Sequence, residues 1–231
     1  MKLNINGYSN TILNNINFEL KKNQNLIILG SNGAGKSTFA KVLSGIMPSK
    51  HVTINNKQLH NLNAKSRTKY INYIPAKLEI FDEYITLDEY LNLSRLHTLL
   101  ASKNMLKFLE IEHLKNKPCQ QLSSGEQQLA MLATAVLHNA ETTIFDEPTA
   151  NLDPQKSRDV FSLLKSNLFQ RKIIITHDLM LAYRLGYDVV YIKDGTISFF
   201  DSSEKFFNTL NLDHYFGSSV KIIDNFVLVN L

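Results

Sequence analysis

Residues Gly30-Ser31-Asn32-Gly33-Ala34-Gly35-Lys36-Ser37 read as G-x-x-x-x-G-K-S. The apolar run 26–29 before them has the length of a buried strand. The apolar residues after them repeat at helical spacing, namely Phe39, Val42, Leu43 and Ile46. A strand, a glycine-rich turn and a helix in this order form the setting in which such a turn binds phosphate. A surface loop rich in glycine and serine is the alternative, but the matching flanks favour a nucleotide site.

Each residue type in this turn has a physical role in nucleotide binding. Glycines let backbone N–H groups converge on a phosphate without obstruction by a Cβ atom, and the helix N-terminus adds partial positive charge. We expect Lys36 to reach the β- and γ-phosphates and the hydroxyl of Ser37 to face Mg²⁺.

The overall composition is that of an ordinary globular protein. The chain has 231 residues, 44% hydrophobic and 20% charged, so one large domain, or one domain with a subdomain, is expected. Its net charge of +4 comes with scattered lysines, which does not favour nucleic acid as a partner. The single cysteine, Cys119, excludes an internal disulfide and a cysteine-based zinc site. No apolar run approaches the roughly 20 residues that cross a bilayer, so we expect a soluble, cytoplasmic chain.

Apolar alternation and turn residues divide the chain into α/β segments around a helical stretch. Residues 1–24 alternate as strands of a small antiparallel sheet, with Tyr8 in the turn between them. Further strands are expected at 52–54, 70–74, 142–145, 172–176, 189–192, 196–200, 220–223 and 226–229. From about residue 86 to residue 138 the apolar residues repeat with a helical period, which predicts an inserted helical subdomain.

Two helix starts carry capping residues. Before an amphipathic helix at 129–137, the pairs Ser123…Glu126 and Ser124…Gln127 both have capping-box spacing. Asp153 and Pro154 stand at the cap and first-turn positions of a later helix. Capping is a sufficient reason for the serines, but it does not explain the whole string 122–128.

Polar residues that suit phosphoryl chemistry follow two of the expected strands. Asp146 and Glu147 come directly after the strand at 142–145, at the edge where open α/β sheets bind ligands. The first acid can hold Mg²⁺, and the second can orient and deprotonate an attacking water. His177 follows the strand at 172–176 and can hydrogen-bond a γ-phosphate. A solvated acidic turn and a structural histidine are the alternatives, which the glycine-rich turn upstream disfavours.

Five strings follow one another along the chain. They are the Walker A loop 30–38, the signature Leu122-Ser123-Ser124-Gly125-Glu126-Gln127, the Walker B string 143–149, the D-loop Asn151-Leu152-Asp153 and the switch His177-Asp178. Together they make the chain resemble the ATP-binding subunit of ABC transporters over essentially its whole length. The resemblance implies a P-loop NTPase of the α/β class, with a RecA-like core, a small antiparallel β subdomain and an inserted α-helical subdomain. One ABC ATPase domain would span 1–231, with core and β subdomain at 1–83 and 141–231 and the helical subdomain at about 84–140.

The resemblance also assigns roles to individual residues. It implies that Tyr8 stacks on the adenine ring and that the phosphates of ATP are bound by Gly30, Ser31, Asn32, Gly33, Ala34, Gly35, Lys36, Ser37 and Thr38. Ser37 and Asp146 would serve Mg²⁺. Lys36, Glu147 and His177 would be catalytic, with Glu147 as general base and His177 as sensor of the γ-phosphate. ATP held by a second copy of the chain would face Ser123, Ser124, Gly125, Glu126 and Asp153.

Two positions depart from the family pattern. Ser124 stands where the signature has its first glycine, and serine is small enough to be tolerated. Ala76 follows Tyr73-Ile74-Pro75, where the family has a glutamine that contacts Mg²⁺ and water and signals to the membrane partner. Alanine can do none of these jobs. Slow, loosely coupled or regulatory turnover is therefore an alternative, unless water or Glu79 substitutes.

Within the family, the strings 62–73, 177–182 and 214–217 most resemble ATPases of importers for iron–siderophore, haem, cobalamin and related metal chelates. Zinc and manganese importers share the string 177–182 and stay an alternative. The resemblance implies a homodimer that sandwiches two ATP molecules on the cytoplasmic face of the cell membrane. Its partners would be two permease subunits and, indirectly, a substrate-binding protein. The permease would dock around 76–85 through Phe81, Tyr84 and Ile85, unless these residues belong to the subdomain core.

Overall fold

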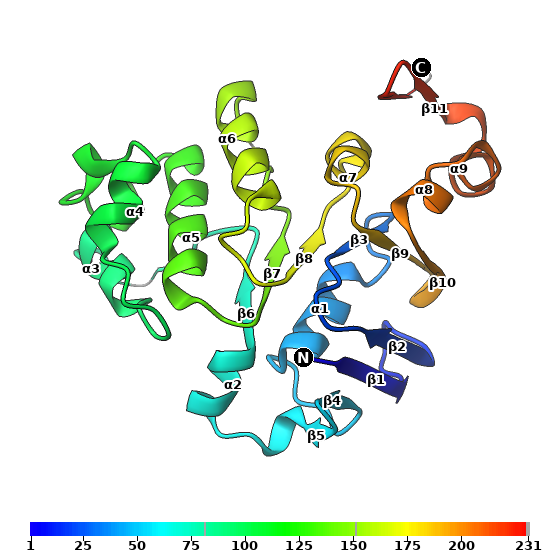
Figure 1. The fold of residues 1–231 in the computed structure, drawn as a ribbon, viewed down its shortest axis with the longest axis horizontal. Helices are drawn as coiled ribbons and strands as arrows, with labels where there is room; N and C mark the ends of the chain where they lie inside the picture. The colour runs from blue at the N-terminus through cyan, green and yellow to red at the C-terminus, as the bar shows by residue number, and fades with distance from the viewer. Residues whose placement is uncertain (81, 151, 230–231) are drawn as a thin grey trace. The chain divides into compact units, whose positions relative to one another are not determined.

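The computed structural model describes residues 1–80, 82–150 and 152–229, which form two compact units. The first unit joins Met1–Asn61 to Ile173–Leu231, and the second is Leu62–Lys172. Each unit contains helices and parallel strands, so the predicted α/β class is confirmed (Figure 1). Phe81 and Asn151 lie outside the described residues. The division into a core and a helical subdomain at about 84–140 stays a prediction.

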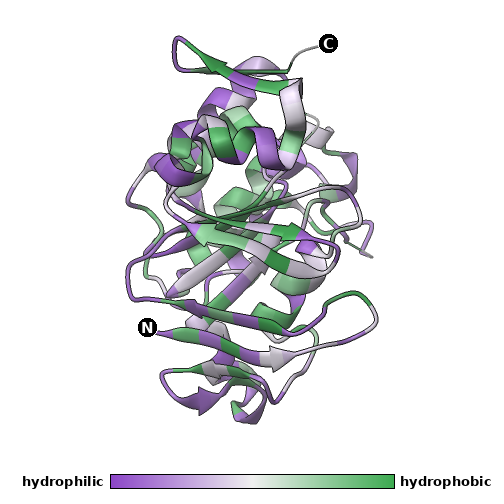
Figure 2. Ribbon diagram, turned by 90° about the vertical axis from the view of Figure 1, so that its right-hand side faces the viewer, coloured by the Kyte–Doolittle hydropathy of each residue, from purple (hydrophilic) through white to green (hydrophobic). Residues whose placement is uncertain are grey.

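The first unit contains a small antiparallel sheet with the strand order β2-β1-β4-β5. Its strands are β1 (Leu3–Tyr8), β2 (Ile16–Leu20), β4 (Val52–Ile54) and β5 (Lys57–Gln58). Polar and apolar segments alternate along β1, the strand nearest the N-terminus (Figure 2). Leu3 and Ile5 are apolar residues of this strand, and both are buried. Tyr8 is the last residue of β1, opposite Ile16, and not in the turn as expected. A register shift after Ile5 lets the strand pairing continue to that point.

The second sheet of this unit is built around β3 (Leu26–Gly30). β8 (Lys172–Ile175) and β9 (Asp188–Lys193) flank it in parallel, and β10 (Thr196–Asp201) pairs antiparallel with β9. Residues 26–29 are at most 1% exposed, as continuous apolar runs in parallel sheets are. Parallel pairing places the carboxyl ends of β3 and β8 at the same edge, which is where the phosphate loop begins.

Glycines end several helices of the first unit. α1 (Lys36–Ser44) ends at the left-handed Gly45, so Ile46, expected on the helix, lies beyond it and is 56% exposed. α7 (Leu179–Leu185) begins after Asp178, whose side chain accepts from the backbone N–H of Leu181. The remaining elements are η1 (Leu59–Asn61), α8 (Ser203–Phe206), α9 (Thr209–Phe216), η4 (Gly217–Ser219), β11 (Val220–Ile223) and β12 (Phe226–Val229).

The second unit has two parallel strands and five α-helices among its described residues. The strands are β6 (Ile71–Ile74) and β7 (Thr142–Asp146), with Ile71 opposite Thr142 and Ile74 opposite Phe145. Its helices are α2 (Ala64–Tyr70), α3 (Leu87–Leu93), α4 (Ser102–Phe108), α5 (Ser124–His138) and α6 (Pro154–Lys165), with short 3-10 turns η2 (Glu112–Leu114) and η3 (Cys119–Gln121). In the described parts of the chain, no helix combines the length and the apolar character that a membrane crossing requires.

Candidate active site

The phosphate loop runs from Gly30, the last residue of β3, to Gly35, the N-cap of α1. Gly35 has a φ of 102°, a left-handed conformation in which a side chain would be strained. A Cβ atom at Gly30 would collide with the carbonyl oxygen of Ile192 on β9. Both glycines of the sequence pattern are therefore required by the path of the backbone.

The start of α1 presents backbone donors to the loop. α1 has nine residues, and no side chain caps its N-terminus, because the N-cap is Gly35. The first-turn N–H groups and the positive end of the helix dipole are the groups that bind a phosphate at such a position. Ser31, Asn32, Gly33 and Ser37 are exposed around it, Thr38 is half-buried and Ala34 is buried. The loop is thus open to a ligand on one side.

The ammonium group of Lys36 lies across the loop. Its Nζ atom donates to the carbonyl oxygens of Gly30 and Ser31, at 2.9 Å each, and the residue is 8% exposed. Carbonyl oxygens are weaker partners for an ammonium than a charged phosphate oxygen is. A nucleotide phosphate entering the loop would therefore compete well for this lysine.

His177 shares a cavity with the phosphate loop. The cavity has a volume of about 410 Å³ and is lined by Leu29, Gly30, Ser31, His177, Leu179, Tyr191, Tyr215, Phe216 and Ser219. His177 is exposed, two residues after the end of β8. The structure therefore brings His177 to the loop, as the common sheet edge predicts. The aromatic wall from β9 and α9 was not expected, since these residues carry no local signal of a site.

Asp146 is the last residue of β7, in the second unit, and is 5% exposed. Its Oδ2 atom accepts a hydrogen bond of 2.6 Å from the hydroxyl of Tyr73 on β6. Burial and the neighbouring Asp146 raise the pKa of the Tyr73 phenol, so the phenol stays protonated and acts as the donor. Tyr73 is the residue of this site that sequence reasoning missed. No local signal in the sequence points to it, because the contact depends on the parallel register of β6 against β7.

Glu147 leaves the strand in an uncommon backbone conformation. Its φ is +50°, in the left-handed region that costs a non-glycine residue about 1–2 kcal/mol. The side chain is half-buried, and the carbonyl oxygen of Glu147 accepts from the N–H of Ala150 at 3.1 Å. The turn separates the two acids: Asp146 remains in the strand, and Glu147 lies beyond its end. This separation is compatible with different roles for the two carboxylates.

The signature residues form the start of α5 in the second unit. Ser123 is the N-cap: its hydroxyl oxygen accepts from the N–H of Glu126 at 3.4 Å, and Glu126 accepts from the N–H of Ser123 at 2.7 Å. Of the two capping pairs that the spacing allowed, Ser123 with Glu126 is therefore the one formed. Lys117 adds an ion pair to Glu126 at 3.2 Å. Ser123 and Ser124 are exposed, and Gly125 is buried.

Asp153 has a structural role that its sequence position predicts. It caps α6 by accepting from the N–H of Lys156 at 2.9 Å. That backbone hydrogen bond, together with the nearby Lys156 ammonium, lowers the pKa of the Asp153 carboxyl, so it is ionised near neutral pH. The side chain is exposed, which leaves it accessible to a second copy of the chain.

Tyr8 lies at the end of β1 and is 9% exposed. Its hydroxyl accepts from the side-chain amide of Asn10 at 3.1 Å, and its ring meets that of His51 edge to face at 5.9 Å. The ring is therefore largely covered by the first unit itself. Adenine stacking on Tyr8 stays a prediction.

The segment after β6 exposes an aromatic side chain, Tyr84. Tyr84 is 83% exposed and Ile85 half-buried, so Tyr84 is not part of the subdomain core. A cavity of about 520 Å³ beside them is lined by Asp82, Tyr84, Ile85, Glu89, Asn92 and Leu93. Of the three expected permease contacts, Phe81 lies outside the described residues.

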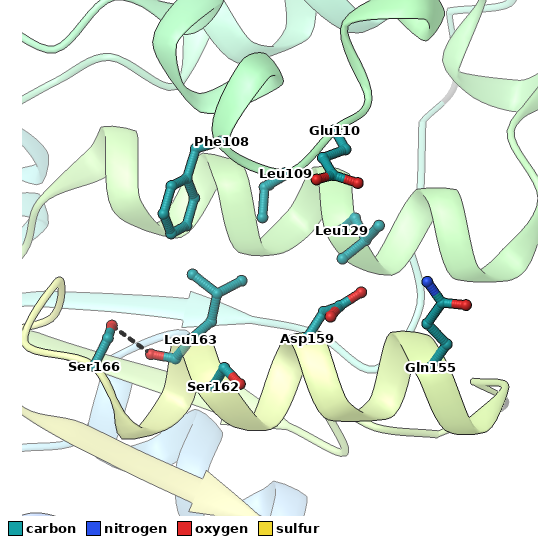
Figure 3. A pocket seen from close by; sticks show the side chains of 9 residues that line it. All are labelled: Phe108, Leu109, Glu110, Leu129, Gln155, Asp159, Ser162, Leu163 and Ser166. Carbon is teal, nitrogen blue, oxygen red and sulfur yellow. Dashed lines mark hydrogen bonds between the residues drawn. The ribbon is translucent and has the colours of Figure 1, made fainter.

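A separate cavity of about 390 Å³ lies between α5, α6 and the end of α4 (Figure 3). Leu109, Leu129 and Leu163 give it an apolar lining, and Glu110 and Asp159 add carboxylates. Its nine lining residues include none that the sequence assigns to nucleotide or metal. This cavity is therefore not part of the candidate active site.

Proteins of known family match most of the chain. The model of the ABC transporter family matches residues 13–150. An uncharacterized ABC transporter ATP-binding protein of Methanocaldococcus jannaschii is 30% identical over 223 residues, which cover 90% of this chain and 87% of that protein. The zinc import ATP-binding protein of Buchnera aphidicola is 34% identical over 183 residues, which cover 78% of this chain and 73% of that protein. Other relatives are named for molybdate or tungstate import and for lipoprotein release.

Solved structures share the fold. The dimeric structure of a bacterial ABC transporter cassette has a TM-score of 0.73 at 23% identity and covers 87% of this chain and 98% of its own. An inward-facing transporter described as metal-chelate type has a TM-score of 0.75 at 20% identity. The match covers 99% of this chain and 95% of the transporter's chain. The phosphate loop and signature thus occur in a chain whose sequence relatives are transport ATPases. The chain belongs to the ABC transporter family, as an ATP-binding subunit whose ATPase activity powers transport.

Proposed function

We propose that the chain is the ATP-hydrolysing subunit of an importer and works as a homodimer that binds two ATP molecules. The observation that carries this proposal is the Lys36 ammonium, held by two carbonyl oxygens across a loop whose residues 31–33 are exposed. A triphosphate bound in the loop would replace these oxygens as the partner of the ammonium. The dimeric cassette of the same fold supports the proposed assembly.

Each ATP would lie between the loop of one copy and the signature of the other. In the capping box, the Ser123 hydroxyl acts as an acceptor, so its hydrogen can still be donated to a γ-phosphate oxygen. The exposed Ser123, Ser124 and Asp153 lie at the starts of α5 and α6, where a partner's nucleotide can reach them. The buried Gly125 would contribute its backbone N–H group.

Mg²⁺ fits the oxygen donors that the chain offers. The Ser37 hydroxyl and the Asp146 carboxylate are hard ligands, and Mg²⁺ is commonly held by one or two carboxylates together with substrate phosphates. In the described ranges, no group of three or more His, Cys, Asp or Glu residues could hold a metal by itself. This agrees with an ion that is bound jointly with ATP. When bound, the ion would neutralise charge on the β- and γ-phosphates.

Glu147 would orient and deprotonate the attacking water, and His177 would hydrogen-bond the γ-phosphate. The left-handed turn at Glu147 and the position of His177 in the cavity of the loop support these roles. We expect purified chain to hydrolyse ATP in Mg²⁺ but not in EDTA. Glu147→Gln should lower the rate by roughly 10²- to 10⁴-fold, the usual contribution of a general base. The exposed Glu204→Gln is the control, and equal rates for both variants would reject an enzymatic role for Glu147.

A slow or regulatory ATPase is the second candidate, and Ala76 is the observation that favours it. Ala76 stands where the family glutamine would contact Mg²⁺ and water, and its methyl group can do neither. A basal rate that stays low even with the permease bound would favour this candidate.

The proposed cargo is an iron–siderophore, haem, cobalamin or similar metal chelate. The metal-chelate type transporter supports this by fold only, and the zinc import relative keeps the zinc or manganese alternative open. Two permease subunits would hold the ATPase at the cytoplasmic face of the membrane and would receive the cargo from a substrate-binding protein. Tyr84 and Ile85 are the proposed docking contacts. Loss of copurification with the permease in Tyr84→Ala, but not in the exposed Leu210→Ala, is expected.

A further inference from the structure

The buried carboxylate of Asp146 depends on a tyrosine from the neighbouring strand. Among the described residues, the Tyr73 hydroxyl is the group that hydrogen-bonds the Asp146 side chain, at 2.6 Å. Hydrogen bonds from a hydroxyl to a carboxylate at 2.5–2.7 Å are roughly twice as strong as those between neutral groups. Asp146 is 5% exposed, so water has little access to replace this donor. The bond is thus the main local restraint on one carboxylate oxygen.

The strand register explains how this contact arises. β6 and β7 are parallel, and Tyr73 lies opposite Ile144. Residues two apart on a strand point to the same face, so Asp146 follows Ile144 on one face of β7. The long phenol side chain reaches forward along this face to Oδ2 of Asp146. Oδ1 is left as the oxygen that can meet a ligand.

We propose that Tyr73 is a positioning residue for Mg²⁺: its hydroxyl holds the Asp146 carboxylate so that Oδ1 is presented to the metal or to its bound water. This inference rests on the proposed function, since it assumes that Asp146 serves the nucleotide-bound Mg²⁺. Groups that hydrogen-bond a metal ligand set its orientation, and their loss weakens metal binding. The positioning role of Tyr73 matters more in this chain because Ala76, three residues later, has no polar side chain that could contact the metal.

The test measures metal binding directly rather than turnover. Mn²⁺ is titrated into ATP-bound protein in the Glu147→Gln background, and free Mn²⁺ is read by electron paramagnetic resonance. We expect Tyr73→Phe to weaken Mn²⁺ binding roughly tenfold, within the range for groups behind a metal ligand. ATP affinity in EDTA should be unchanged, because the proposed role of the Tyr73 phenol acts through the metal, which EDTA removes.

Two further variants separate positioning from general stability. Tyr70→Phe is the matched control, because Tyr70 is also half-buried and its hydroxyl makes no hydrogen bond to the described residues. Para-aminophenylalanine placed at position 73 keeps an N–H donor near Asp146 and should restore Mn²⁺ binding. It also gives a folded variant if Tyr73→Phe proves unstable.

The outcomes distinguish this inference from the function on which it rests. If the wild type binds ATP and Mn²⁺ and Tyr73→Phe binds both equally well, the inference is wrong and the proposed function stands. An equal loss in Tyr70→Phe, or no recovery with para-aminophenylalanine, also contradicts it. If the wild type binds neither ATP nor Mn²⁺, the proposed function fails and the inference fails with it.

Discussion

The side chain of Lys156 lies directly over Gly125. A Cβ atom added at position 125 would be 2.7 Å from Cδ and 2.8 Å from Nζ of Lys156. Lys156 extends from the first turn of α6, where its Nζ atom pairs with Asp153 at 3.5 Å. Gly125 therefore has two reasons to be glycine: the packing of Lys156 and the proposed contact with a partner's phosphate.

Gly125→Ala should leave stability nearly unchanged but weaken dimer formation. The flexible lysine can move aside, and alanine in a helix is better than glycine by about 0.5–1 kcal/mol, which offsets the lost contact. We expect the free energy of unfolding in urea to change by less than about 1 kcal/mol, since the partly exposed Lys156–Asp153 pair is also worth little. In the Glu147→Gln background, light scattering should detect ATP-dependent dimers, and adding Gly125→Ala should abolish them. Lys156→Ala adds no atom at Gly125 and should dimerise; normal dimers of Gly125→Ala would contradict the signature contact.

Lys36→Ala should abolish tight ATP binding. Removing one partner of a buried charge pair costs about 2–5 kcal/mol, which corresponds to a loss of affinity of more than tenfold. Lys41→Ala is the matched control, because Lys41 is exposed on the same helix. Calorimetric titration with ATP in EDTA measures the affinity of the phosphate loop for ATP without a bound metal. Similar affinities for the two variants would mean that Lys36 keeps its carbonyl partners when ATP is bound.

Ala76→Gln should raise the ATPase rate of the complex with the permease. The glutamine side chain would add the missing group that contacts Mg²⁺ and water, and the half-buried position leaves room for part of it at the surface. The control is Lys77→Gln at the exposed neighbouring position. Rates are compared in the reconstituted complex with its permease. An unchanged or lower rate for Ala76→Gln would show that the missing glutamine is compensated elsewhere.

Cys119 should be unreactive in the folded protein. It is 1% exposed, and burial, with a further contribution from Glu89, raises the pKa of its thiol to about 11. Only the thiolate reacts, and at pH 8 about one thiol in a thousand would be ionised at this pKa. We expect a disulfide reagent at pH 8 to label one thiol per chain in guanidinium and almost none in the native state. Equal labelling rates in both conditions would mean that the segment around Cys119 opens readily.

Most elements could be predicted because their signals are local. The apolar run 26–29 is buried as expected, Asp153 caps α6, and Asp224 and Asn225 turn the last hairpin with positive φ. The prediction failed where the local signal was absent or misleading. α2 was missed because none of its residues is buried, so it has no apolar periodicity. Ile46 fits the spacing of α1 but follows the left-handed Gly45 that ends the helix.

The sequence by itself determined the phosphate loop, the helix caps and the family. These depend on residue types at short spacings, where glycine conformation and backbone hydrogen bonds act within one turn. Only the tertiary structure decided that the Tyr73 hydroxyl meets Asp146, 73 positions later, and that Lys156 covers Gly125. Such contacts depend on strand register and helix packing, which bring distant residues together by the burial of whole faces. No spacing along the chain specifies them.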